Sequence, residues 1–206
     1  MTERPLNVLC VVGTSAGSSA THVVISRFAE GLSALGDEVD VFDPNQEALP
    51  LFNPQSSFSL PAFLNLKERV ERADAYVFGT PDYHGSVSST LKNFLDHFWD
   101  EFTGKLFAQV VCSQEKGLTV IDQLRTMARQ CYAWSMPYGV SFSATDLKDG
   151  KIVTEAVERR VEMLVHDLHV YGAVLRRQRE IDLTGTLPSF LATAREANKP
   201  VIVKSV

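Results

Sequence analysis

Short, almost continuous apolar segments alternate along this chain with segments of helical periodicity, and no other feature of the sequence restricts the fold as strongly. The first apolar segment, residues 6–12, ends at Gly13 and has the composition of a strand that is covered on both faces of a parallel sheet. Residues 38–42 alternate in polarity, which is typical of a strand near a sheet edge. Further apolar segments of strand length follow at residues 75–80, 106–113 and 138–143.

The segments between these strands carry apolar residues at every third or fourth position, which predicts helices. In the first of them Val24, Phe28 and Leu32 share one face, and Gly36 supplies a C-terminal stop. Comparable helical patterns lie at residues 63–73, 91–98, 120–131 and 157–175. This alternation predicts an α/β fold: a doubly wound, five-stranded parallel sheet in the order 2-1-3-4-5, with helices on both faces.

The composition is that of one compact domain, with 45% hydrophobic residues in a chain of 206. We expect this domain to cover residues 1–180. Residues 181–206 follow the last core helix and are expected to form a C-terminal extension of unknown role, in which Pro188 could begin a short further helix.

Residues 43–61 interrupt the alternation with four prolines and are longer than an ordinary connection between a strand and a helix. Two interpretations stay open. The segment is either a functional loop or partner surface, or a plain surface loop that Leu51 and Phe52 hold down.

The charges of the chain exclude two classes of partner. The formal net charge of −5 comes from 25 acidic and 20 basic residues, without a block of like charge, so neither nucleic acid nor a membrane surface is an expected partner. No apolar run approaches the roughly 18 residues that a membrane helix needs, and the start of the chain is polar. The sequence therefore favours a cytoplasmic protein.

A metal centre is not expected either. Cys10, Cys112 and Cys131 lack CxxC spacing and lie in apolar stretches, as reduced core cysteines do. His166 and His169 stand three residues apart on an expected helix and could bind a metal, but they have no third ligand, so a solvated helix face is favoured.

Three loops are candidates for chemistry. In an open doubly wound sheet, ligands bind beyond the carboxyl ends of the strands at the point where the strand order reverses, here between the first and third strands. The loops that reach this point are residues 13–21, 81–87 and 114–117.

The first loop reads GTSAGSSAT and directly precedes a helix. Its hydroxyl groups and the free N–H groups of the helix could hold a phosphate, although Ser19 or Thr21 could equally serve only as a helix cap. The loop has neither the GxGxxG fingerprint of dinucleotide-binding folds nor a P-loop lysine. No cysteine is followed by an arginine six residues later, which excludes a cysteine phosphatase.

The second loop carries the most specific pattern. Residues 80–86 read TPDYHGS, and L-K-N follows at residues 91–93 with Asp96 three positions later. This pattern resembles that of the NADPH-dependent FMN reductase family of flavodoxin-like proteins, and the resemblance extends over residues 6–145. Lys92 and Asp96 could equally form a plain ion pair on the helix surface.

The resemblance implies a flavodoxin-like fold, FMN as cofactor and NADPH or NADH as electron donor. It also implies that FMN contacts residues of all three loops: Thr14, Ser15, Ser19, Ala20, Thr21, Pro81, Asp82, Tyr83, His84, Gly85, Ser86, Ser113, Gln114, Lys116 and Gly117.

The chain departs from the family pattern at several places. The arginine of the family's first loop is Ala16 here and its asparagine is Thr21, so a phosphate would be held without a side-chain charge. The usual asparagine of the second loop is His84, which could act as a catalytic proton donor or acceptor or could only make a hydrogen bond. Residues 113–117 replace the glycine-rich third loop.

The family resemblance implies an enzyme that passes a hydride from NAD(P)H through bound FMN to a small-molecule acceptor such as a quinone or free flavin. The alternatives are a flavodoxin-like electron carrier without its own NAD(P)H turnover, or a flavin-binding regulator. A homodimer or homotetramer is also expected, because a helix from Ser88 to Trp99 that continues to Phe102 would carry more aromatic surface than one sheet can cover.

Overall fold

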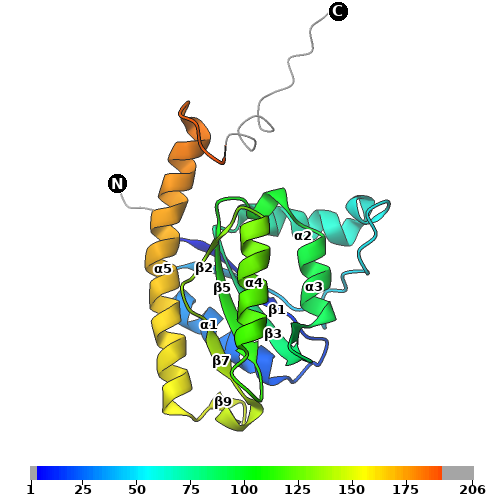
Figure 1. The fold of residues 1–206 in the computed structure, drawn as a ribbon, viewed down its shortest axis with the longest axis vertical. Coiled ribbons are helices and arrows are strands. Elements are labelled where there is room, and N and C mark those ends of the chain that lie inside the picture. The colour runs from blue at the N-terminus through cyan, green and yellow to red at the C-terminus, as the bar shows by residue number, and fades with distance from the viewer. Residues whose placement is uncertain (1–3, 192–206) are drawn as a thin grey trace, which may run out of the picture.

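The computed structural model describes residues 4–191 and contains the expected α/β sandwich (Figure 1). Its parallel sheet has the strand order β2-β1-β3-β5-β6, which is the predicted order 2-1-3-4-5. The bounds of its strands are Asn7–Val12 (β1), Glu38–Phe42 (β2), Ala75–Tyr83 (β3), Leu106–Cys112 (β5) and Trp134–Ser135 (β6). The predicted doubly wound α/β arrangement is therefore confirmed.

The last strand of the sheet is divided into two short pieces. Trp134–Ser135 (β6) pairs with the start of β5, and Val140–Phe142 (β7) pairs with its end. Pro137 lies between the two pieces, and a proline cannot donate a backbone hydrogen bond to a neighbouring strand. The sequence predicted a single strand over residues 138–143, so only its second piece was anticipated.

Two hydrophobic cores cover the two faces of the sheet. Ala20–Ala34 (α1) and Glu155–Thr184 (α5) pack on one face, and the helices Pro61–Arg72 (α2), Ser89–Asp96 (α3) and Leu118–Gln130 (α4) pack on the other. Alternate residues of β1 belong to opposite cores, with Val8 and Cys10 facing α1 and α5, and Leu9 and Val11 facing α2 and α3. In Figure 1, α5 forms one side of the molecule and extends past the sheet.

The helix after the second loop is shorter than predicted. It ends at Asp96, and a separate 3-10 turn follows at Asp100–Phe102. Phe94, Phe98 and Phe102 are almost fully buried inside the chain, whereas Trp99 keeps 59% of its surface exposed. The break turns Phe102 inward against Tyr76 and Phe107. The prediction that one continuous helix exposes more aromatic surface than the sheet can cover was therefore wrong, except at Trp99.

The long loop at residues 43–61 is held by α3. Asn93 donates to the carbonyl groups of Leu49 and Pro50 and accepts from the amide of Phe52 at 2.7 Å. Phe52 also packs edge-on against His97. Leu51, in contrast, is 84% exposed. Phe52 thus holds the loop down as expected, Leu51 does not, and the asparagine of the L-K-N motif does most of the anchoring.

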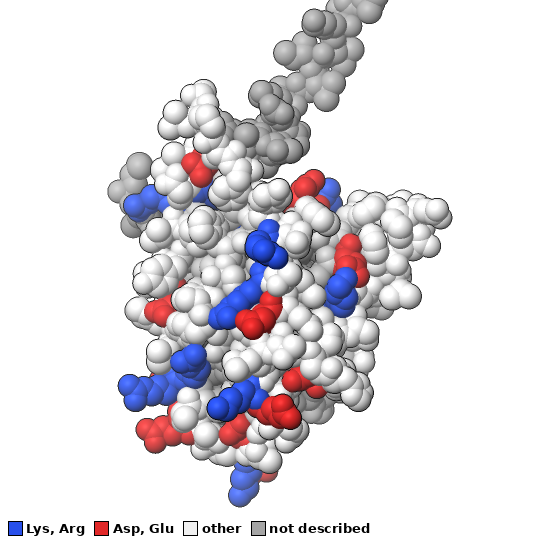
Figure 2. All heavy atoms as spheres, in the orientation of Figure 1, with Lys and Arg blue, Asp and Glu red and all other residues white. Residues whose placement is uncertain are grey.

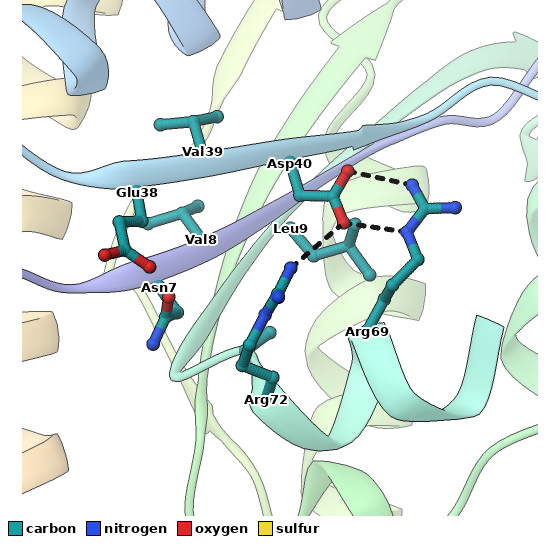
Figure 3. Close-up of a pocket in the computed structure, with 9 residues that line it drawn as sticks. Asn7, Val8, Leu9, Glu38, Val39, Asp40, Arg69 and Arg72 are labelled. Atoms are coloured by element: carbon teal, nitrogen blue, oxygen red, sulfur yellow. Dashed lines mark hydrogen bonds and ion pairs between the residues drawn. The ribbon is translucent and has the colours of Figure 1, made fainter. Parts of the chain in front are cut away.

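The cavity in Figure 3 lies between β1, β2 and the end of α2 and has a volume of only about 60 Å³. Arg69 makes two hydrogen bonds to Asp40, at 2.7 and 2.9 Å, and Arg72 approaches the same carboxylate at 3.8 Å. Because these arginines of α2 are already paired with Asp40 of β2, the residues that line this small cavity hold α2 against β2, and we do not assign it a ligand.

Beyond α5, residues 185–191 contain no helix, so Pro188 does not begin one within the described chain. The rest of the predicted extension, from residue 192, lies outside the described residues. Among the helices at residues 4–191, none is both long and apolar enough to cross a membrane.

Lys105, directly before β5, is a buried cation that the sheet topology places under the end of α2. Its Nζ donates to the carbonyls of Val70 and Glu71, both at 2.8 Å, and to the hydroxyl of Tyr76 at 3.2 Å. Burial lowers the pKa of Lys105 from 10.5 to about 7. The lysine thus caps a helix C-terminus from inside the core.

We expect Lys105→Met to change how stability depends on pH. Between about pH 7 and 10.5 the unfolded wild type binds a proton that the folded protein does not, so the wild type gains stability as the pH rises. The free energy of unfolding of the wild type should therefore rise by a few kcal/mol, relative to that of the variant, across this interval. Urea unfolding at several pH values measures this difference, and parallel curves for the two proteins would contradict the prediction.

Candidate functional site

The parallel pairing of β1 with β3 ends at two glycines, Gly13 directly after β1 and Gly79 within β3. The Gly13 amide donates to the Gly79 carbonyl at 2.8 Å. A Cβ on Gly13 would lie 2.3 Å from that carbonyl oxygen and 2.7 Å from the Cβ of Leu91. The backbones can approach this closely because Gly13 has no side chain. The two loops that follow these strands therefore start next to each other.

The first loop ends in a capped helix start. Ser19 is the N-cap of α1, and its hydroxyl accepts the amide of His22 at 3.1 Å. Within the described residues the amides of Ala20 and Thr21 have no hydrogen-bond acceptor. Ser15 is exposed, whereas Thr14 and Thr21 are buried, at 4% and 2% exposure. The capping interpretation of Ser19 is confirmed, and two free amides remain beside it.

Ser88 joins the first two loops. Its hydroxyl donates to the Gly13 carbonyl and accepts the Leu91 amide, so that it also caps α3. Its own amide donates to the hydroxyl of Thr80 at 3.0 Å. Gly13 directly follows β1, and Thr80 lies in β3 just before the second loop, so Ser88 holds the first two loops in one arrangement.

The second loop is a tight hairpin. The end of β3 pairs with Ser86–Val87 (β4), with Tyr83 opposite Ser86. His84 and Gly85 form the turn and have φ angles of +57° and +75°. A turn with two residues in the left-handed region favours glycine and asparagine, and histidine also tolerates it better than most residues. The side chains of Tyr83 and His84 are exposed at the carboxyl edge of the sheet.

Asp82 connects the second loop to the third. One carboxylate oxygen accepts the Gly85 amide at 2.8 Å, and the other accepts the Ser113 hydroxyl at 2.8 Å. Ser113 in turn accepts the Glu115 amide at 3.2 Å. The Gly85 amide is therefore occupied inside the protein and is not free for a ligand.

Gln123 of α4 supports the same hairpin from the other side. Its amide nitrogen donates to the Gly85 carbonyl at 3.0 Å, and its oxygen accepts from the Ser86 hydroxyl and the Val87 amide. The sequence interpretation missed Gln123 and Ser88. Ser88 lies next to the motif and has the spacing of an N-cap, but Gln123 is distant along the chain and nothing in the sequence marks it.

A groove of about 770 Å³ lies between the second and third loops. Of the predicted contact residues, it is lined by Asp82, Gly85, Ser113, Gln114, Lys116 and Gly117. Gly117 has a φ of +58°, and a Cβ there would lie 2.8 Å from Val111. The tertiary structure thus brings together two of the three predicted loops around one groove, and Ser88 attaches the first loop to them.

The two histidines on α5 face different carboxylates. His169 Nδ1 faces both carboxylate oxygens of Asp37 at 3.0 Å, while His166 is paired with its neighbour Asp167. No cluster of three or more metal-ligating side chains occurs among the residues that the structure describes.

Sequence comparison finds a family match and curated relatives. The family model for NADPH-dependent FMN reductase matches residues 6–146. An NADPH azoreductase of Bacillus sp. (strain OY1-2) is 29% identical over 179 residues, which cover 85% of this chain and 97% of that protein. An NADPH-dependent FMN reductase, ArsH, of Shigella flexneri is 24% identical and is covered over 72% of its length.

Solved structures share the fold. A flavoenzyme NAD(P)H:(acceptor) oxidoreductase, FerB, from Paracoccus denitrificans aligns with a TM-score of 0.67 at 18% identity, over 84% of this chain and 98% of that one. A flavodoxin from the domain Archaea aligns with a TM-score of 0.59 at 12% identity, over 81% of this chain and 99% of that one.

Proposed function

Since the chain belongs to the NADPH-dependent FMN reductase family of FMN-dependent NAD(P)H oxidoreductases, we propose that it binds FMN across its three loops and reduces a small-molecule acceptor with NADPH or NADH. One observation carries this proposal: Asp82 accepts hydrogen bonds from both the second and the third loop, next to the groove that these loops line. A carrier without NAD(P)H turnover is disfavoured, because the family match is to reductases.

The first loop fits a phosphate. The free amides of Ala20 and Thr21 lie at the positive end of the α1 dipole, and the exposed hydroxyl of Ser15 adds a further donor. A Cβ on Gly17 would have no neighbour within 4 Å, so the loop has open space around it. These groups would hold the phosphate of FMN without a basic residue in the loop.

The second and third loops would hold the flavin ring. Bound FMN would supply the hydride chemistry, accepting two electrons from the nicotinamide and passing them on. Asp82 and Gln123 keep the hairpin in one shape, so that Tyr83 and His84 present their rings at the same place. Gln114 and Lys116 would approach the ring from the third loop.

Steady-state oxidation of NADPH and of NADH tests the proposal. FMN-loaded protein should consume NAD(P)H in the presence of a quinone, free FMN or an azo compound, the last suggested by the azoreductase relative. FMN should also raise the melting temperature through its binding to the folded state. The proposal fails if saturating FMN causes neither a thermal shift nor NAD(P)H turnover.

His84 would donate or accept a proton near the ring, since its side chain is exposed beside the groove and histidine changes charge near neutral pH. His84→Asn should flatten the neutral limb of the pH profile for acceptor reduction, while FMN affinity stays within a few-fold. Asparagine suits the left-handed turn as well as histidine does, so the hairpin is preserved. An unchanged pH profile would leave His84 with a hydrogen-bonding role only.

The protein would act as a homodimer or homotetramer. Residues 48–66 contain no charged residue, and the corresponding lobe at the upper right of Figure 2 is white. Beside it lies a groove of about 780 Å³ between α2, α3 and α4, with Phe58, Leu64 and Trp99 at least half exposed. A second copy of the chain would cover this apolar surface.

Trp99→Glu should shift the protein toward the monomer, because it adds a charge to an exposed residue that lines this groove. Light scattering at micromolar concentration measures the mass, and Val174→Glu, at an exposed position of α5 on the other face of the sheet, is the control. A monomeric mass for the FMN-loaded wild type would contradict the expected assembly.

A further inference from the structure

His22 is a titratable side chain next to the first loop. It is the third residue of α1, and side chains on a helix point back toward its N-terminus. The side chain is 31% exposed, but its Nδ1 atom is buried and makes no hydrogen bond to the described residues. Nδ1 faces the Asp43 carboxylate at 3.4 Å, which is an ion pair only when the imidazole is protonated.

Asp43 is a buried carboxylate next to His22. It follows β2, is 5% exposed, and accepts the backbone and side-chain amides of Asn45 at 2.9 and 2.8 Å. The side-chain amide of Asn45 also donates to the Thr14 carbonyl at 3.2 Å. A chain of contacts therefore runs from His22 through Asp43 and Asn45 to the first loop.

A bound phosphate would leave an excess of negative charge around Asp43 and the start of α1. Asp43 forms no ion pair with a lysine or arginine in the described chain, and Gln46 is its other side-chain donor, at 3.4 Å. Among residues 4–191, Asp43 is the carboxylate that pairs with His22. Arg27, further along α1, is paired with Glu158. A phosphate at the start of α1 would add negative charge beside the buried carboxylate, and the imidazole that faces this carboxylate can supply a positive charge.

We propose that His22, oriented by Asp43, takes up a proton when the phosphate of FMN binds and so supplies the positive charge that the first loop lacks. This inference rests on the proposed function. The protonated imidazole has two N–H donors, one of which can bond Asp43 while the other is available to a second acceptor, whereas the neutral ring has one. FMN affinity then depends on the protonation of His22, and riboflavin affinity does not.

The experiment compares wild type, His22→Gln and His22→Arg by flavin fluorescence titration with FMN and riboflavin between about pH 6.5 and 8.5. FMN itself titrates near this range, so the quantity of interest is the ratio of variant to wild-type Kd at each pH. For FMN the His22→Gln ratio should be about tenfold at the low end and approach 1 at the high end. For riboflavin it should stay near 1 throughout, which also shows that the variant is folded.

His22→Arg should bind FMN more tightly than the wild type at the high end, because its charge does not titrate. Calorimetry in buffers of different ionisation enthalpy should show proton uptake on FMN binding by the wild type and less by His22→Gln. A pH-independent ratio, or equal losses for FMN and riboflavin, would overturn the role of His22 while leaving the FMN site intact. Failure of the wild type to bind FMN at all would overturn the proposed function and this inference with it.

Discussion

Ser19→Asp should weaken FMN binding by about 100-fold or more while leaving riboflavin binding nearly unchanged. Ser19 is the N-cap of α1, directly beside the free amides that would hold the phosphate. A like charge at about 5 Å costs on the order of 3 kcal/mol at an intermediate effective dielectric constant, and each 1.4 kcal/mol is about tenfold in affinity. Equilibrium titration with the two flavins measures the difference.

The substitution suits this position because aspartate is itself a good N-cap. The helix start is therefore preserved, and the loss reports the charge rather than unfolding. Ser19→Asn is the matched control: it caps the helix equally well, has nearly the same shape, and carries no charge. Equal losses of FMN and riboflavin in the aspartate variant would show that the first loop does not hold a phosphate.

Gly13→Ala should lower the free energy of unfolding by about 3 kcal/mol or more. The added methyl group would lie 2.3 Å from the Gly79 carbonyl and 2.7 Å from the Leu91 Cβ, so that β1 or β3 has to shift. The Gly13 amide donates to that same carbonyl, and this hydrogen bond would weaken as well. Thermal unfolding should show Tm reduced by roughly 6–12 °C.

Gly17→Ala in the same loop is the control for stability. A Cβ there meets no atom within 4 Å, and the residue does not lie in the left-handed region, so Tm should stay within a few degrees of the wild type. If the two variants had the same Tm, the close approach of the strands at Gly13 would not be a source of stability.

The carboxyl edge of the sheet was predictable from the sequence because its determinants are local. The apolar segment before Gly13 indicates a buried strand, and a serine before a helical pattern indicates a cap, and each of these is found. The hairpin at His84 and Gly85 belongs to a motif that is contiguous in the chain. The strand order then follows from the alternation of strands and helices.

Other features depend on which side chains meet in space, and the sequence does not encode them locally. The helix α3 stops at Asp96 because Phe98 and Phe102 find buried partners on α2 and β5. The side chain that packs the long loop down is Phe52 rather than Leu51, since the Phe52 ring meets His97 at the end of α3 whereas Leu51 is exposed.

The contacts that hold the three loops in place also depend on the tertiary structure. Gln123 is 38 residues from Gly85 and His22 is 21 residues from Asp43, so no local periodicity brings either pair together. The sheet brings these residues together, because the loops and helix starts that follow parallel strands all lie at its carboxyl edge. The sequence by itself determined which loops reach that edge. Only the packing of α4 and the turn after β2 decided which side chains hold those loops in place.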